Sequence, residues 1–346
     1  MEEWKEYKLG DVLTIKYGKD HKQLADGDIP IYGSGGIMRY GERSLYEGPS
    51  ILIPRKGSLN NVMYSDKPFW TVDTMFWTII NEEVANPLFI YYSICKKDFT
   101  SLNVGSAVPS LTVPVIEDVD ILLPSRFTQD KIVSILKSLD DKIEANRRIN
   151  DNLEQQALAL FDELFPNVAS GDEVVGDMMT PKRGKGLLSK DAVEGEVPVV
   201  AGGIDPATYH NTANTKAPVV TIAASGANAG YVNLWHVPVW SSDSSYIDAT
   251  MTENVYFWYV LLKKRQKEIF DAQVGSAQPY IYPKHIAEMP IRKIETSDIT
   301  KFVALVTPMF EMRGRNIEEN RRLADVRDSL LPKLMSGRIK VSETNV

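Results

Sequence analysis

The sequence contains one internal repeat, and this repeat constrains the fold more than any other feature. Leu9-Gly-Asp-Val12 recurs as Val175-Gly-Asp-Met178, at an offset of 166 residues. Ile143–Arg148 recurs as Ile317–Arg322 at an offset of 174 residues, and further matches lie between these two in the same order. Offsets that grow slowly along collinear matches indicate a duplicated unit, so we expect the chain to build one domain twice.

Each copy combines short β-rich segments with one internal helical segment and a long helix at its end. Runs such as Ser50–Pro54 and Val219–Ala223 favour strands, and Gly, Asn, Ser and Pro turns separate them. Helical patterns over Pro87–Lys97 and Asn254–Phe270 interrupt the strands. Each copy therefore mixes helix and sheet.

A domain plan follows from this organisation. We predict an α+β fold with two repeated mixed α/β domains, residues 1–125 and 166–297, separated by two long antiparallel coiled-coil helices, residues 126–165 and 298–337. Residues 338–346 are expected to form a C-terminal tail. A length of 346 residues is sufficient for two separate cores.

The long helices have a periodic stripe of apolar and Asn residues at alternating steps of four and three, the a/d pattern of a coiled coil. In the first helix the stripe comprises Ile132, Leu136, Leu139, Ile143, Asn146, Asn150, Leu153, Ala157, Leu160 and Leu164. In the second it comprises Val306, Phe310, Ile317, Asn320, Ala324, Leu331 and Leu334, interrupted by Arg313 and Arg327. A small β domain cannot bury so long a stripe, so we predict that the two helices pair with each other.

Asn146 and Asn320 occupy equivalent positions on the two stripes. A buried Asn on such a stripe lowers stability but fixes the register and orientation of the pair. Alternatively, both side chains face solvent at the edge of the stripe. A helix of about 37 residues is roughly 55 Å long. This exceeds the roughly 34 Å turn of B-DNA, so domains at opposite ends of such a rod could contact two separated sites.

Composition limits the possible functions. The formal net charge of −7 argues against a protein that binds DNA unaided, because such proteins usually displace counterions with a basic surface. Local basic clusters at Lys16–Lys22, Arg55–Lys56 and Lys182–Lys185 are either phosphate contacts or ordinary solvated charge. With Cys95 alone and four histidines, we expect neither a disulfide nor a metal site.

The sequence has no segment suited to a membrane or to export. The first residues lack an apolar stretch, and no apolar run approaches the roughly 20 residues that span a bilayer. We therefore expect a cytoplasmic protein.

Several motifs resemble those of the specificity subunits of type I restriction-modification enzymes, and the resemblance covers essentially the whole chain. It rests on Trp4-Lys-Glu-Tyr-Lys-Leu-Gly-Asp11 and on Gly-Ser-Ala-x-Pro before each long helix, at Gly105–Pro109 and Gly275–Pro279. It also rests on Leu139–Arg148 and on the ending Arg327–Ile339.

The resemblance implies two target-recognition domains, each recognising one half of a bipartite sequence in double-stranded DNA. It implies that the long helices separate these domains and dock two modification (methyltransferase) subunits, through which restriction (ATP-dependent translocase and nuclease) subunits join the complex. Methyl transfer, ATP hydrolysis and cleavage then belong to partner chains, so this chain is expected to be non-catalytic and to need no cofactor. Partners that enclose the DNA would also compensate for the negative charge.

Polar loop residues are the candidates for DNA contact, because phosphates bind cations and hydroxyls, whereas base edges bind forked or amide side chains. In the first domain they are Lys19, Lys22, Arg39, Arg43, Arg55, Lys56, Ser58, Asn60 and Asn61. In the second they are Lys182, Arg183, Lys185, His210, Asn211, Asn214, Asn228, Ser244 and Ser245. Taken singly, each is equally compatible with a solvated loop side chain.

Motifs for catalysis are weak. Asn86-Pro-Leu-Phe89 approaches the Asn-Pro-Pro-aromatic loop of adenine methyltransferases, but it is one residue short, and its proline suits the first turn of a helix. Gly33–Gly36 lacks the lysine and hydroxyl residue of a phosphate loop. Two alternatives stay open: a self-contained DNA methyltransferase or nuclease, and a coiled-coil scaffold whose β domains do not bind DNA.

Overall fold

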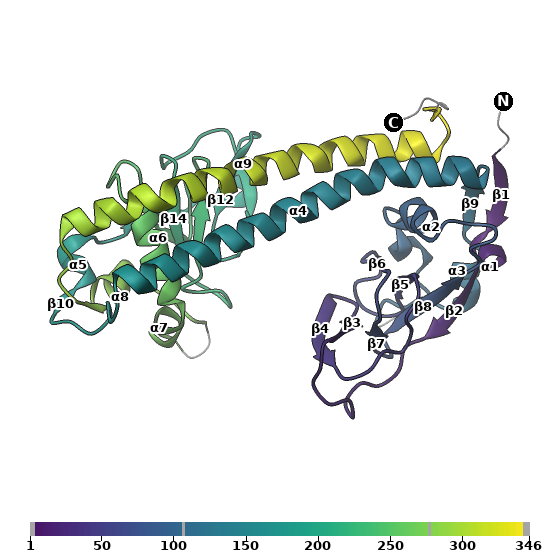
Figure 1. The fold of residues 1–346 in the computed structure, drawn as a ribbon, viewed down its shortest axis with the longest axis horizontal. Helices are drawn as coiled ribbons and strands as arrows, with labels where there is room; N and C mark the ends of the chain where they lie inside the picture. Colours follow the sequence, from purple (N-terminus) through teal and green to yellow (C-terminus); the bar gives the residue numbers. More distant parts are fainter. Residues whose placement is uncertain (1–3, 106–107, 276–277, 342–346) are drawn as a thin grey trace. The chain divides into compact units, whose positions relative to one another are not determined.

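A computed structural model describes residues 4–105, 108–275 and 278–341 (Figure 1). The two Gly-Ser-Ala-x-Pro motifs and the predicted C-terminal tail therefore lie partly outside the described residues. Internal contacts divide the chain into unit 1, residues 1–142 and 322–346, and unit 2, residues 143–321. The long helices α4 (Arg126–Leu164) and α9 (Thr296–Met335) each contribute a segment to both units.

The described residues of unit 1 form three small sheets. Its strands are β1 (Lys5–Lys8), β2 (Leu13–Tyr17), β3 (Ile29–Gly33), β4 (Gly36–Gly41), β5 (Ser50–Pro54), β6 (Met63–Ser65), β7 (Trp70–Thr71), β8 (Met75–Ile80) and β9 (Asp120–Leu123). They form an antiparallel sheet of order β2-β8-β5-β6, a sheet of order β4-β3-β7 in which β3 and β7 are parallel, and the antiparallel pair β1-β9. The short helices are α1 (Leu9–Val12), α2 (Pro87–Ile94), a 3-10 turn (Phe99–Leu102) and α3 (Val113–Glu117).

Unit 2 repeats this arrangement. Its strands are β10 (Glu173–Val174), β11 (Lys182–Arg183), β12 (Val197–Val200), β13 (Thr208–His210), β14 (Val219–Ala223), β15 (Val232–Trp235), β16 (Trp240–Ser241), β17 (Ser244–Asp248) and β18 (Pro290–Ile291). The orders β11-β17-β14-β15, β13-β12-β16 and β10-β18 match those of unit 1, including the parallel pair β12 and β16. Its short helices are α5 (Val175–Met178), a 3-10 turn (Ser189–Asp191), α6 (Val255–Lys264), α7 (Gln266–Asp271) and α8 (Pro283–Ala287).

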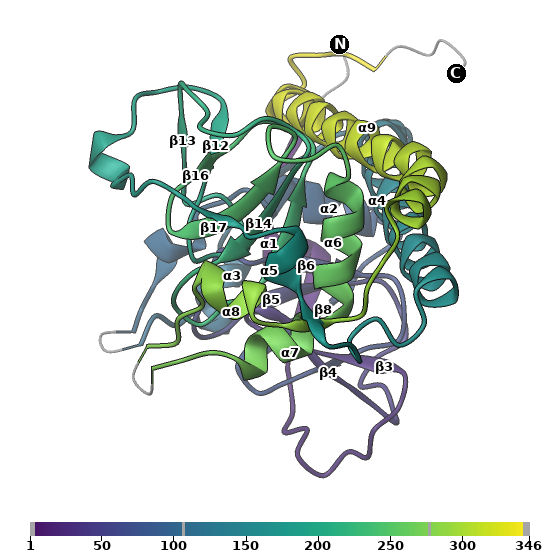
Figure 2. The ribbon, with the colours of Figure 1, turned by 90° about the vertical axis from the view of Figure 1, so that its left-hand side faces the viewer.

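The shared strand order confirms the predicted α+β fold built from a repeated mixed domain. In unit 2, helix α6 lies between the four-stranded sheet and the long helices (Figure 2). Its Phe257 belongs to the same apolar core as Ile222 of β14 and as Phe161 of α4 and Phe302 of α9. In unit 1, α2 has the corresponding position, because Phe89 shares a core with strand β5 and with the long helices. The four-stranded sheet of each unit therefore buries an apolar face against one short helix.

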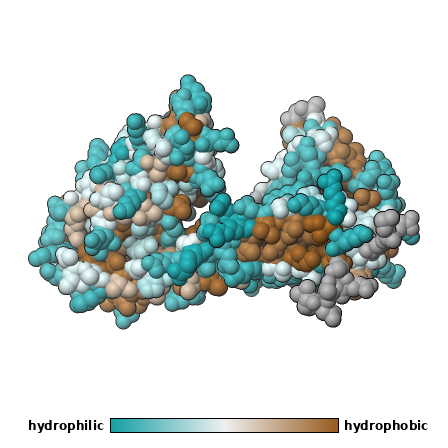
Figure 3. Space-filling model, turned by 90° about the horizontal axis from the view of Figure 1, so that it is seen from above, coloured by the Kyte–Doolittle hydropathy of each residue, from teal (hydrophilic) through white to brown (hydrophobic). Residues whose placement is uncertain are grey.

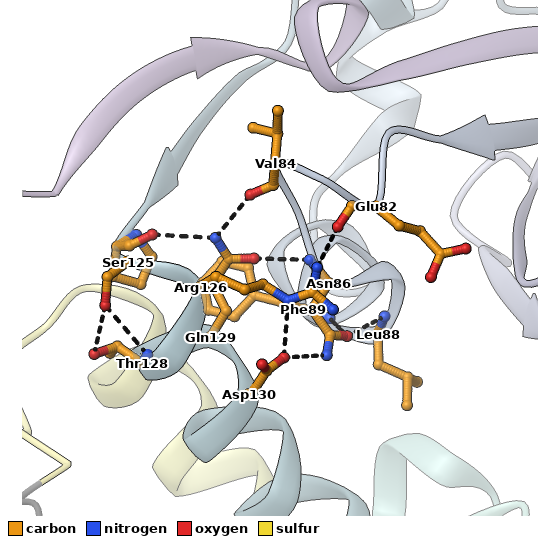
Figure 4. Close-up of polar contacts among 11 residues, drawn as sticks. Glu82, Val84, Asn86, Leu88, Phe89, Ser125, Arg126, Thr128, Gln129 and Asp130 are labelled. Atoms are coloured by element: carbon orange, nitrogen blue, oxygen red, sulfur yellow. Dashed lines mark hydrogen bonds and ion pairs between the residues drawn. The ribbon is translucent and has the colours of Figure 1, made fainter.

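Helix α2 begins at the motif that approaches a methyltransferase loop, and its structural interpretation is confirmed. Asn86 Oδ1 accepts hydrogen bonds from the backbone N–H groups of Leu88 (2.9 Å) and Phe89 (3.3 Å), which caps the helix. Asn86 Nδ2 donates to Asp130 (2.7 Å), and the backbone N of Asn86 donates to Gln129 Oε1 (2.8 Å), as Figure 4 shows. These bonds join the start of α2 to the start of α4.

The two long helices are antiparallel where they pair. In unit 2, Asn146 Nδ2 donates to Asn320 Oδ1 (2.9 Å), and Asn316 Nδ2 donates to Asn150 Oδ1 (2.8 Å). Residue numbers therefore rise along α4 as they fall along α9. Asn146 is 1% exposed, so it lies in the pair and not at a solvent-facing edge.

The predicted stripe is wrong at two positions, whose side chains are exposed. Ile317 is 45% exposed, because Asn316 faces α4 there and a neighbouring residue points about 100° away around the helix. Leu164 is 42% exposed, because Phe161 and Phe165 face the core at the end of α4. The stripe drifts because 3.6 residues per turn do not match a strict seven-residue repeat.

Most other stripe positions point inward. Ile132, Leu136, Ile143, Val306, Phe310, Leu331 and Leu334 are buried, and Leu139, Leu153, Leu160 and Asn320 are partly buried.

The arginines that interrupt the stripe form ion pairs between the helices. In unit 1, Arg327 Nη1 lies 2.7 Å from Asp140 Oδ1, and Tyr92 Oη donates to Asp140 Oδ2 at 2.6 Å. Burial raises the pKa of Tyr92, and the hydrogen bond to Asp140 raises it further. In unit 2, Arg313 lies 3.6 Å from Glu154, which accepts a hydrogen bond from Tyr259. Each unit thus joins its short helix to both long helices through a tyrosine, a carboxylate and an arginine.

Candidate nucleic-acid interface

Unit 1 presents a Lys-x-Gly-Lys turn after strand β2. Lys19 N donates to Thr71 O (2.9 Å), and the indole Nε1 of Trp70 donates to Lys19 O (2.9 Å). A Cβ on Gly18 would lie 2.0 Å from the carbonyl oxygen of Val72, so only glycine permits this approach. The turn is fixed by its backbone, which leaves the lysine side chain of Lys19 exposed.

Unit 2 builds the same turn after β11. Lys185 N donates to Ser241 O (2.9 Å), and Trp240 Nε1 donates to Lys185 O (2.8 Å). A Cβ on Gly184 would lie 2.5 Å from Ser241 O. Lys182 and Lys185 are exposed. The repeat therefore preserves a rigid turn that displays cations.

A surface hollow of about 490 Å³ adjoins the turn of unit 1. Its lining is His21, Gly33–Met38 and Val72–Thr74. Asn61 Nδ2 donates to Ser34 O at 2.8 Å, and Arg55 Nη1 donates to Asp73 O at 3.2 Å. These bonds place two predicted DNA contacts, Asn61 and Arg55, at the rim of the hollow.

Other predicted contacts of unit 1 are on its surface. The Arg55 guanidinium lies 5.5 Å from the centroid of the exposed Tyr17 ring, and the Arg43 guanidinium lies 5.7 Å from that of Trp70. Lys22, Lys56 and Ser58 are exposed as well. Cationic and aromatic groups side by side on loops are typical of nucleic-acid surfaces.

Two predicted contacts of unit 1 are bonded to other loops of the domain instead. The Arg39 guanidinium donates to the carbonyl oxygens of His21 and Leu24 (both 2.7 Å) and pairs with Asp26 at 2.9 Å. It ties strand β4 to the loop before β3. The amide of Asn60 is bonded to residues 98 and 100 on both its oxygen and its nitrogen.

In unit 2, three predicted contacts are wrong because their side chains are buried. Ser244 and Ser245 are 0% and 1% exposed, and Ser244 Oγ donates to Val200 O (3.2 Å) inside the domain. His210 is 7% exposed, and its Nδ1 accepts a hydrogen bond from Val193 N at 2.9 Å. Serine and histidine in a β-rich segment give no local signal for the side of the sheet that they face.

The remaining predicted contacts of unit 2 differ in availability. Asn211 is exposed and Asn228 is partly buried. Asn214 bonds to the backbone of Ser241 through both its Nδ2 (2.9 Å) and its Oδ1 (2.7 Å), so it holds the strand edge. Arg183 Nη2 lies 2.5 Å from Asp243 Oδ1, in a half-exposed ion pair.

No described group points to catalysis by a thiol or a metal. Burial raises the pKa of the Cys95 thiol to about 11, which disfavours the nucleophilic thiolate. Within residues 4–105, 108–275 and 278–341, no cluster of His, Cys, Asp and Glu side chains is arranged to hold a metal ion. None of the helices in these ranges is both long and apolar enough to cross a membrane.

Comparison with known proteins finds similarity to type I restriction specificity subunits. Residues 1–155 match the family model described as type I restriction modification DNA specificity domain. The MjaIX specificity subunit of a type I restriction enzyme from Methanocaldococcus jannaschii is 26% identical over 393 aligned residues, covering 98% of this chain and 89% of the relative. The chain is therefore similar to type I specificity subunits, and the family model matches its N-terminal 155 residues. A Mycoplasma pneumoniae protein named as a type I specificity subunit is 22% identical, with 96% of each chain covered.

The fold is also similar to that of a solved structure. The crystal structure of a type I restriction-modification S subunit from M. genitalium superposes with a TM-score of 0.61 at 19% identity, covering 96% of each chain. The relatives are specificity subunits, and the comparisons support neither the methyltransferase or nuclease alternative nor the scaffold alternative.

The sequence analysis did not identify several residues that shape the candidate interface. Trp70 and Trp240 clamp the lysine turns, and Asp73 lines the hollow. A signal was present, because Trp-x-x-Asp recurs in both copies as Trp70–Asp73 and Trp240–Asp243. The glycine between two lysines recurs in the same way.

Proposed function

We propose that the chain is the DNA sequence-specificity subunit of a type I restriction-modification complex. Residues 1–125 and 166–297 are its two target-recognition domains, and each recognises one half of a bipartite target. One observation supports this most strongly: units with the same strand order each display the same rigid lysine turn, clamped by a tryptophan. Two copies of one recognition surface suit a target with two halves.

In the first domain, the proposed DNA contacts are the loop residues whose cationic or polar groups are accessible. They are Lys19, Lys22, Arg43, Arg55, Lys56, Ser58 and Asn61. In the second domain they are Lys182, Arg183, Lys185, Asn211 and Asn228. The lysines bind phosphates, which sets affinity and salt dependence, and the arginine and amide side chains contact base edges.

Catalysis belongs to partner chains in this proposal. Two modification subunits bind along the long helices and transfer the methyl group, and restriction subunits hydrolyse ATP and cleave. The net charge of −7 fits this division, because partners that enclose the DNA supply part of the phosphate contact.

The long helices offer an apolar surface for such partners. In unit 1, Val326 is 47% exposed, and Ile135 and Leu330 are partly buried. Figure 3 shows apolar side chains gathered on this part of the helix surface. An exposed apolar patch flanked by charged residues is typical of a protein interface.

A selection experiment tests the function. The full-length chain is co-expressed with its modification subunits, and the purified complex selects from random DNA duplexes that are then sequenced. We expect enrichment of one motif with two separated halves. Enrichment of no motif, or specific binding and methylation by this chain without partners, would refute the proposal.

Salt dependence tests the lysine turns. Replacing Lys19 with alanine in the assembled complex removes one phosphate contact, so the slope of log affinity against log salt should fall by about 0.9 for every sequence. Lys185→Ala should act in the same way in the second domain. Lys293→Ala is the matched control, because Lys293 is an exposed lysine that belongs to neither turn and pairs with Glu295. An unchanged slope for both turn variants would contradict their role.

A further inference from the structure

The carboxylate of Asp73 is exposed at the hollow of unit 1 and has no partner there. The backbone oxygen of Asp73 accepts the hydrogen bond from Arg55, but its carboxylate makes no hydrogen bond or ion pair with any described residue. This acceptor lies among the groups that we assign to DNA contact, including Arg55 and Lys19.

In the second repeat the corresponding carboxylate has side-chain partners. Asp243 also follows its tryptophan by three residues, but it pairs with Arg183 at 2.5 Å and accepts a hydrogen bond from Ser225. In the lysine turn of unit 1, Tyr17 is the residue equivalent to Arg183, and a tyrosine cannot form that ion pair. The difference between the copies therefore leaves one carboxylate free.

A free carboxylate on a phosphate-binding surface has a cost, because it repels the DNA backbone. Its chemistry suits one kind of DNA group. Ionised aspartate only accepts hydrogen bonds, and the donors on base edges in the major groove are the exocyclic amino groups of cytosine and adenine. Guanine O6 and N7 and thymine O4 are acceptors there, and they would be rejected.

The lining of the hollow supports the same assignment. Ile37 and Met38 are 49% and 59% exposed, so an apolar surface faces the space beside the carboxylate. Gly35 and Gly36 have no atom within 4 Å of a Cβ built on them, so the turn leaves room for a base edge. Arg55 lies against the backbone of Asp73, which places a donor next to the acceptor.

We propose that Asp73 is a specificity-determining residue, which accepts a hydrogen bond from the exocyclic amino group of one cytosine or adenine in the half-site bound by unit 1. The inference rests on the proposed function as a specificity subunit. An acidic side chain, and not a cationic one, then selects one base of the target.

The test uses complete complexes with modification subunits. Wild type, Asp73→Asn, Asp73→Ala and the control Asp66→Asn each select from random duplexes, and binding to the wild-type motif is measured at one salt concentration. Asp66 is an exposed carboxylate of the same domain outside the lining of the hollow, so its variant removes the same charge. Thermal unfolding checks that all variants fold.

We expect Asp73→Ala to lose preference at a single cytosine or adenine of one half-site, with affinity for the wild-type motif lowered about 10- to 100-fold. Asp73→Asn should broaden or change the base at that same position, because an amide both donates and accepts. The selected base distinguishes cytosine from adenine. Asp66→Asn should keep the whole motif.

Two results would overturn the assignment. If the Asp73 variants keep every base preference and bind all DNA more tightly, Asp73 is an ordinary surface charge, while the motif of the wild type still supports the proposed function. If the wild-type complex enriches no motif, the proposed function itself fails, and this inference fails with it.

Discussion

The ring of His236 lies against helix α9 in unit 2 and gives a prediction about pH. Its Nε2 is 3.3 Å from Arg313 Nη1, and a Cβ on Gly314 would lie 2.8 Å from the imidazole Cγ. Burial lowers the pKa of His236 from 6.5 to about 4, and the charge of Arg313 contributes. The imidazole is therefore neutral in the folded protein, with a ring nitrogen that accepts from the guanidinium.

The sign of the effect follows from where protons bind. Between pH 6.5 and about 4 the unfolded chain protonates His236 and the folded chain does not, so the free energy of unfolding falls as the pH falls. The contribution is complete above pH 6.5. At pH 5 the loss is about 2 kcal/mol, and below pH 4 it reaches about 3 kcal/mol.

Hydrogen exchange measures this in the full-length chain. Wild type and His236→Gln are compared at pH 7.5 and at pH 5.0, following amides of α6 in unit 2. Glutamine keeps an acceptor for Arg313 but does not titrate. From pH 7.5 to pH 5.0, the free energy of amide protection should therefore fall by about 2 kcal/mol less in the variant than in wild type. Amides of β5 in unit 1 are the internal control. An equal loss in wild type and variant would refute the assignment of a depressed pKa to His236.

Three further predictions concern the packing of the long helices. Tyr92→Phe removes a hydrogen bond to a carboxylate and should lower the free energy of unfolding by about 2 kcal/mol in urea titrations; a change below 0.5 kcal/mol, roughly the size expected for surface substitutions, would contradict the pairing. Replacing both Asn146 and Asn320 with leucine should stabilise the helix pair but make its register less specific. The melting temperature should rise by about 2–4 °C for each kcal/mol gained in the free energy of unfolding. A lower melting temperature would show that the amide pair stabilises the helices. Gly314→Ala should not raise the free energy of unfolding in wild type, because the new Cβ clashes with the His236 ring. In a His236→Ala background the same change should raise it by about 1 kcal/mol, as measured in a double-mutant cycle. Equal effects in both backgrounds would exclude the clash.

Local patterns predicted the repeat and the helices well. Collinear matches require only that two segments share residues, and helix periodicity depends on neighbours three and four positions away. Asn86 could be interpreted as a helix cap for the same reason, because its partners at Leu88 and Phe89 are close in the sequence. The glycines of the lysine turns were visible as repeated residues, although the carbonyl groups that they approach were not.

Side chains at the candidate interface were harder to predict. Arg39 and Asn60 look like free polar groups in the sequence, but their partners come from other loops. Ser244 and Ser245 lie in a strand whose neighbours on both sides are distant in the sequence. Asp73 is not among the DNA contacts predicted from the sequence, because a DNA-binding surface is expected to carry positive charge.

The sequence by itself determined that one domain is made twice and that two long amphipathic helices accompany it, because duplication and periodicity are properties of the chain. Only the tertiary structure decided which polar groups are accessible. The availability of a side chain depends on the strands and loops that fold over it. A buried Ser245, an outward-facing Ile317 and a free Asp73 carboxylate are consequences of long-range packing.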